Sequence, residues 1–115
     1  MSPIDASRAM PVGTGDDLDA WLGANGTAAT EVVVSLFKRA SGRQTVTLLD
    51  LQEVALCHGW VDTQTRRIDE ERYAIRFVPR RPGSSWSATN RAAARRLLAT
   101  DRITPAGLTT LPPDL

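Results

Sequence analysis

The chain has 115 residues, 42% hydrophobic and 23% charged, with a formal net charge of +1, which indicates one small globular domain and excludes a polyanion binder that relies on net charge alone. One cysteine excludes an intramolecular disulfide and, with one histidine, a usual zinc site. No apolar signal-peptide core is present and no apolar run approaches the roughly 18 residues of a membrane helix, so we expect a cytoplasmic protein without cofactors or membrane insertion.

The N-terminal part of the chain predicts an edge element, a helix and a strand. We expect residues 1–13 to form a tail or an edge strand, ahead of a domain over residues 14–111 and a C-terminal tail over residues 112–115. Apolar residues at positions i, i+3 and i+4 predict a helix over residues 16–26. A β-branched run over residues 30–39 is apolar on both faces, which predicts a central strand.

A second helix and several short strands follow. Thr47 and Asp50 have nearly the spacing and chemistry of a capping box, so a helix begins at Thr47. The chain then becomes extended, and residues 62–67 predict a hairpin turn. Residues 72–79 alternate apolar and polar side chains, which predicts a strand with a hairpin partner over residues 65–69.

The C-terminal third predicts two more helical segments. Ser87 is a good N-cap residue for a helix that extends to about residue 102. Thr104 and Pro105 begin a short final turn, because Thr caps a helix and Pro is accepted at its first position. The order of the elements and their short connections predict an α+β fold: a small, mostly antiparallel sheet of about four strands packed with about three helices in a single domain.

The least generic segment lies over residues 77–91. It joins arginines and serines to a tryptophan and an asparagine at the start of a helix, where free N–H groups favour anions. Arginine binds carboxylate or phosphate with two hydrogen bonds, and tryptophan offers a stacking surface. The segment predicts an anion pocket, and the alternative is a capped helix with a core tryptophan and solvated arginines. The candidate binding residues are Trp60, Asp62, Arg80, Arg81, Ser84, Ser85, Trp86, Ser87, Asn90 and Arg91.

The helix after residue 87 carries a second candidate surface. At about 100° per residue, Arg91, Arg95 and Arg102 fall on one side, with no interleaved acidic residue to pair with them. This stripe is either a solvated face or a nucleic-acid-binding surface. Asn90 falls inside the apolar arc, where it either hydrogen-bonds a loop backbone or lines the pocket.

Three motifs stand in order along the chain: ALCHGWVD over residues 55–62, PRRPGSSWSATN over residues 79–90, and TPAG over residues 104–107. Together they resemble the YdeI/OmpD-associated, or bacteriocin-protection, family over about residues 15–111. The resemblance implies a small cytoplasmic protein linked by name to bacteriocin tolerance and to an outer-membrane porin, and it supplies no reaction.

We therefore expect a non-enzymatic binding protein for an anionic small molecule or protein partner, connected with bacteriocin tolerance or envelope stress. Asp62 is expected to pair with an arginine of the site and orient it. Nucleic-acid binding is the alternative function. An enzyme acting on a phosphorylated or carboxylated substrate is less favoured, because no phosphate loop or nucleophile elbow is present and no catalytic or metal-binding residue can be assigned.

Overall fold

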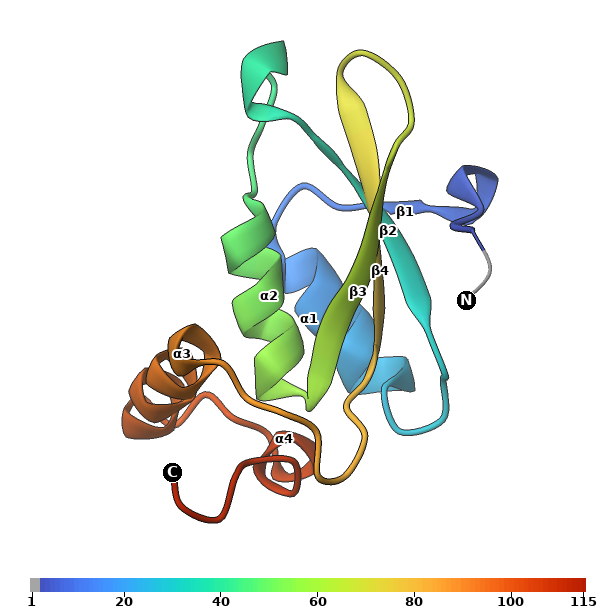
Figure 1. Ribbon diagram of the computed structural model, residues 1–115. Coiled ribbons are helices and arrows are strands. Elements are labelled where there is room, and N and C mark those ends of the chain that lie inside the picture. The colour runs from blue at the N-terminus through green and yellow to red at the C-terminus, as the bar shows by residue number, and fades with distance from the viewer. Residues whose placement is uncertain (1–2) are drawn as a thin grey trace.

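The computed structural model describes residues 3–115 as a four-stranded sheet with helices packed on one of its faces (Figure 1). The strands are β1 (Met10–Pro11), β2 (Val32–Phe37), β3 (Trp60–Arg67) and β4 (Arg72–Pro79). They lie in the order β1-β2-β4-β3, where β1 is parallel to β2 and the other neighbours are antiparallel. This arrangement confirms the predicted α+β fold with a mostly antiparallel sheet.

Side-chain caps begin the α-helices. These helices are α1 (Gly15–Asn25), α2 (Leu48–Cys57), α3 (Ala88–Ala99) and α4 (Pro105–Leu108), and two 3₁₀ turns are η1 (Ala6–Arg8) and η2 (Arg39–Ser41). The caps are Thr14, Thr47, Ser87 and Thr104, each of which accepts a hydrogen bond from a backbone N–H in the first turn. The last three confirm the sequence prediction. Within residues 3–115, none of the helices has the length and apolar character needed to span a membrane.

The main core lies between the sheet and helices α1 and α2. Its largest fully buried side chains include those of Trp60, Phe77, Leu18 and Leu51. Strand β2 lies inside the sheet with five of its six residues buried, which confirms the predicted central strand.

A second apolar cluster attaches the C-terminal part of the chain to the end of α2. Its buried members are Leu56, Cys57, Ala94, Leu97 and Ile103. Leu111 and Leu115 also pack against this cluster. The predicted C-terminal tail over residues 112–115 therefore contacts the rest of the domain through Leu115.

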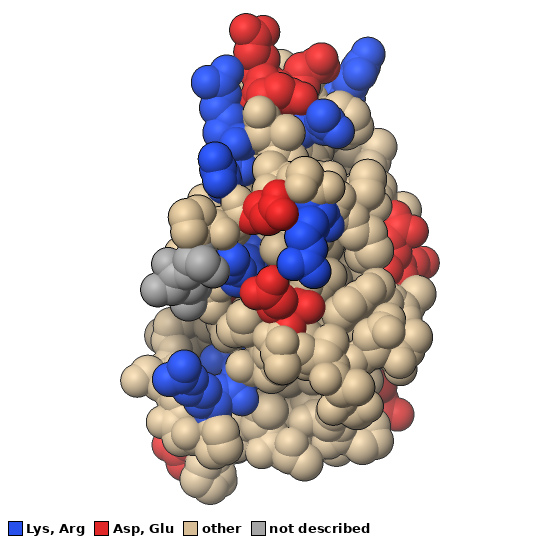
Figure 2. Space-filling view, turned by 90° about the vertical axis from the view of Figure 1, so that its right-hand side faces the viewer, with Lys and Arg blue, Asp and Glu red and all other residues tan. Residues whose placement is uncertain are grey.

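The N-terminal segment covers part of the opposite face of the sheet. Ile4 packs against Val33 and Ala74, and its carbonyl accepts a hydrogen bond from Arg66 at 2.7 Å. Figure 2 views the molecule from the side of this segment and shows basic and acidic side chains interspersed over the surface. Among the residues that the structure describes, that face presents no broad patch of one charge.

The prediction of a hairpin turn over residues 62–67 is wrong. These residues belong to β3, which pairs with β4 along its length and has a register shift between Asp62 and Gln64. The chain turns instead over residues 68–71, so two strands take the place of the predicted three. The sequence prediction missed this strand for two reasons. Strand β3 lies at the edge of the sheet, so most of its side chains are exposed, and its register shift interrupts the apolar–polar alternation by which a strand is recognised.

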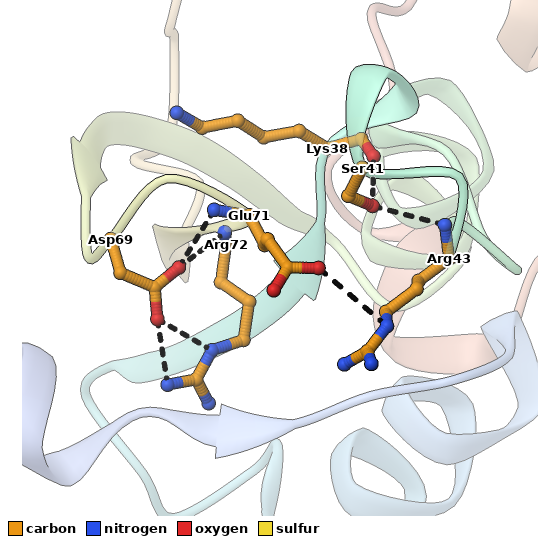
Figure 3. A network of polar contacts seen from close by, with 6 residues as sticks. All are labelled: Lys38, Ser41, Arg43, Asp69, Glu71 and Arg72. Carbon is orange, nitrogen blue, oxygen red and sulfur yellow. Dashed lines mark hydrogen bonds and ion pairs between the residues drawn. The ribbon is translucent and has the colours of Figure 1, made fainter.

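Asp69 holds the turn between β3 and β4 (Figure 3). Its Oδ1 accepts hydrogen bonds from the backbone N–H groups of Glu71 at 2.9 Å and Arg72 at 2.8 Å. Its Oδ2 accepts two more from the Arg72 guanidinium, at 3.2 and 3.0 Å. These bonds, with the Glu71 N–H contributing most, lower the pKa of Asp69 below its usual value of 3.8.

We expect Asp69→Asn to destabilise the protein at neutral pH and to have little effect in acid. A carboxylate with a depressed folded-state pKa stabilises the fold above its unfolded pKa of about 3.8, and this contribution is lost as the pH falls through the lower folded-state pKa. Thermal unfolding of both proteins at neutral pH and well below pH 3.8 measures the effect. A difference in melting temperature that is the same at both pH values would contradict this role of the charge.

Candidate anion-binding site

Three segments that are distant in sequence meet at one end of the sheet, where α2 ends, β3 begins and β4 leads toward α3 (Figure 1). The backbone N–H of Arg80 donates to the carbonyl of Gly59 at 2.9 Å, and Trp60 is the register partner of Pro79. The carbonyl of Cys57 accepts hydrogen bonds from the backbone N–H and the hydroxyl of Thr104, at 2.9 and 2.8 Å. The three sequence motifs therefore lie in contact with one another.

A tight turn follows Arg80. The N–H of Ser84 donates to the carbonyl of Arg81 at 3.1 Å, and Gly83 has a φ of 73°. A type II turn needs a positive φ at its third residue and favours proline at its second, which is Pro82 here. The Pro-Gly pair thus accounts for the turn. The turn reverses the chain between Arg80 and Trp86, whose side chains are in contact.

The guanidinium of Arg80 lies over the ring of Trp86, with Cζ 4.0 Å from the ring centroid. This distance is within the range of a cation–π contact. The side chain of Arg80 donates no hydrogen bond to the residues that the structure describes, and its Nε is a buried atom without a partner. Burial lowers the pKa of Arg80, and the charge of Asp62 opposes this effect.

Asp62 does not contact an arginine directly within residues 3–115. Its two carboxylate oxygens instead accept hydrogen bonds from Nε2 of Gln52, at 3.4 and 3.3 Å. The predicted pairing of Asp62 with an arginine of the site is therefore wrong as a direct contact, although its charge does act on Arg80. Gln52 lies on α2, and no sequence motif indicated it as a neighbour of β3.

The start of α3 supplies further donors. The Ser87 hydroxyl accepts a hydrogen bond from the N–H of Asn90 at 3.1 Å. The preceding N–H groups of the first turn receive no such side-chain acceptor. Arg81, Ser85 and Ser87 are exposed, and Ser84 is partly buried. Asn90 is also partly buried, and its side chain makes no hydrogen bond within residues 3–115, so the predicted bond to a loop backbone is not seen.

The structure places Trp60 in the core. Its side chain is 2% exposed and packs edge-to-face against Trp21, with ring centroids 6.1 Å apart and an interplanar angle of 85°. A ligand cannot stack on this ring. Of the two tryptophans among the candidate residues, Trp86 is the one that is partly exposed.

Two of the three arginines of the predicted stripe, Arg91 and Arg102, lie beside acidic residues. Arg91 makes a salt bridge with Asp114 at 3.1 Å, and this contact lowers the pKa of the Asp114 carboxyl. Arg102 lines a cavity of about 480 Å³ together with four acidic residues, which are Asp16, Asp19, Asp50 and Glu53. Nucleic-acid binding stays a prediction, and these acidic neighbours would repel a phosphate backbone.

Apart from the buried Trp60, the candidate binding residues are partly or fully exposed, and they do not line the three cavities described here. Those cavities have volumes of about 300, 480 and 260 Å³, and none of the ten candidate residues lines them. What the fold brings together is therefore a partly buried guanidinium, an aromatic ring and a helix start, all on the surface.

No curated protein and no solved structure matches this chain. A family described as a domain of unknown function (DUF8412) matches residues 10–110. The matched range contains all four strands and all four α-helices, together with the three motifs that meet at the end of the sheet. On this match, the chain belongs to the family described as domain of unknown function DUF8412.

Proposed function

We propose that this protein is a non-enzymatic binding protein that holds an anionic group of a small molecule or a protein partner at Arg80, Trp86 and the start of α3. One observation carries the proposal: the Arg80 guanidinium is partly desolvated, lies on Trp86 and donates no hydrogen bond to the described protein. A cation that has lost water without gaining an acceptor is under-satisfied. An anion would supply the missing acceptor.

The neighbouring groups suit the same ligand. The first turn of α3 has free N–H groups and the positive end of the helix dipole, and the segment before it carries the hydroxyls of Ser84 and Ser85. Trp86 restrains the guanidinium from one side, which lowers the entropy lost when a ligand binds. An apolar or aromatic part of the ligand would rest against the exposed part of Trp86.

The expected affinity for a bare anion is low. A charge-assisted hydrogen bond contributes on the order of 1.5 to 3 kcal/mol and a helix N-terminus roughly 0.3 to 1 kcal/mol. Association costs at least about 4 kcal/mol of translational and rotational freedom. Inorganic phosphate should therefore bind in the millimolar range, and phenyl phosphate should bind more tightly because its ring contacts Trp86.

Titration with inorganic phosphate and phenyl phosphate, followed by backbone amide NMR, tests the proposal. We expect the shifts to concentrate at residues 84–91 and Arg80→Ala to weaken binding several-fold. Arg39→Ala is the matched control, because Arg39 is an exposed arginine on η2, outside the three segments of the site. Equal effects of the two substitutions, or shifts spread over all arginines, would show that residues 84–91 are a helix cap without a binding role.

The resemblance to YdeI/OmpD-associated proteins leads us to propose a cellular context as well. It would place this binding role in the cytoplasm and in bacteriocin tolerance or envelope stress. The family description DUF8412 names neither a function nor that resemblance. The binding proposal therefore stands on the Arg80–Trp86 geometry and does not depend on this context.

A further inference from the structure

A separate cavity lies among α1, α4 and the residues between α2 and β3. Its volume is about 260 Å³, which is just below the roughly 300–1,000 Å³ of typical small-molecule sites. The residues that line it are Leu22, Gly23, Gly26, Thr27, His58, Thr104, Pro105 and Ala106. Most of this wall is apolar, and it shares no residue with the Arg80–Trp86 surface.

His58 is the titratable residue of this cavity. Its side chain is 10% exposed, and its Nε2 lies 2.7 Å from Oδ1 of Asp19. A carboxylate can only accept a hydrogen bond, so Nε2 carries the hydrogen. The other ring nitrogen, Nδ1, makes no hydrogen bond within residues 3–115. It is not fully buried, so it remains accessible. Asp19 thus orients the ring through Nε2, and Nδ1 keeps its hydrogen-bonding capacity.

The wall opposite α1 is held in place before any ligand arrives. Thr104 donates two hydrogen bonds to the carbonyl of Cys57 and accepts the N–H of Gly107 at 3.1 Å. These bonds fix α4 against the end of α2, next to His58. The hydroxyl of Thr27, in contrast, makes no hydrogen bond within the described residues and is exposed at the rim.

We infer that this cavity binds a small carboxylic acid with an apolar body. A carboxyl group matches Nδ1 in both states of the ring: its O–H donates to neutral imidazole, and its carboxylate accepts from imidazolium. Thr27 offers a second hydrogen-bond partner at the rim, and the apolar residues from α1 and α4 take the body of the ligand. Within residues 3–115 no cluster of His, Cys and acidic side chains could hold a metal ion, so the pair is not part of such a site.

NMR of the imidazole nitrogens gives a direct readout, because the chain contains one histidine. In tag-free protein labelled with ¹⁵N, we expect benzoate to shift the Nδ1 resonance of His58 in a saturable way in the millimolar range. Methyl benzoate is the matched probe without an ionisable carboxyl, and it should bind several-fold more weakly. The absence of a saturable Nδ1 shift, or equal binding of the two probes, would overturn the inference and leave His58 and Asp19 as a structural link between α1 and α2.

Variants separate this cavity from the surface at Arg80. Ala106→Phe should fill the cavity and abolish the benzoate response, while Asp19→Asn should weaken it several-fold. Asp16→Asn, a change of another acid on the same helix, should leave it unchanged. Arg80→Ala should also leave it unchanged, because the inference does not rest on the proposed function. A response that survives in Ala106→Phe or disappears in Arg80→Ala would overturn the assignment to this cavity.

Discussion

Gly107→Ala is expected to lower the free energy of unfolding by roughly 3 kcal/mol, near the upper end of the usual cost of overpacking. A Cβ at this position would lie 2.2 Å from the carbonyl oxygen of Cys57 and 2.9 Å from Cγ2 of Ile103. The backbone of α2 cannot rotate away as a flexible side chain would. Helix α4 must move instead, and the two hydrogen bonds from Thr104 to Cys57 would be strained or lost.

Gly23→Ala is the matched control for this prediction. Gly23 lies inside α1, and a Cβ there meets no atom within 4 Å. Alanine should therefore raise the free energy of unfolding by about 0.5 to 1 kcal/mol through helix propensity. Urea unfolding of the three proteins measures both changes. A loss smaller than about 0.5 kcal/mol in Gly107→Ala would contradict the close contact between α4 and α2.

Of the two tryptophans among the candidate residues, Trp60 should be the more costly to replace. We expect Trp60→Ala to lower the free energy of unfolding by about 3 to 5 kcal/mol. Trp60 is buried between the sheet and α1 and leaves a large cavity when truncated. Trp86→Ala should cost less, about 1 to 2 kcal/mol, because its ring is partly exposed and packs against the smaller second cluster. Urea unfolding followed by circular dichroism compares the two variants. Equal losses, or the reverse order, would contradict the placement of Trp60 in the core and Trp86 at the surface.

Local signals in the sequence predicted the elements that depend on neighbouring residues. Thr47, Ser87 and Thr104 each cap a helix through a hydrogen bond within three residues, so the helix starts can be read from sequence alone. The alternation of apolar and polar side chains over residues 72–79 likewise predicted strand β4.

Features that depend on distant contacts were missed. Arg76 has the sequence pattern of a solvent-facing residue on β4, yet it is 5% exposed because the N-terminal segment lies over it. Its guanidinium donates to the carbonyl of Pro3, 73 positions earlier, and to Gln64 on β3. The roles of Trp60 and Trp86 likewise depend on which element covers each ring, and composition does not distinguish a core tryptophan from a surface one.

The most direct test of whether the Arg80 guanidinium binds anions is to follow its Nε–Hε NMR resonance during a titration with phenyl phosphate. If it does, the Arg80 signal should shift further than that of any other arginine, over the same ligand concentrations as the backbone amides of residues 84–91. The Arg39 signal should stay in place. An Arg80 resonance that does not move while phenyl phosphate saturates another part of the protein would contradict the proposed site.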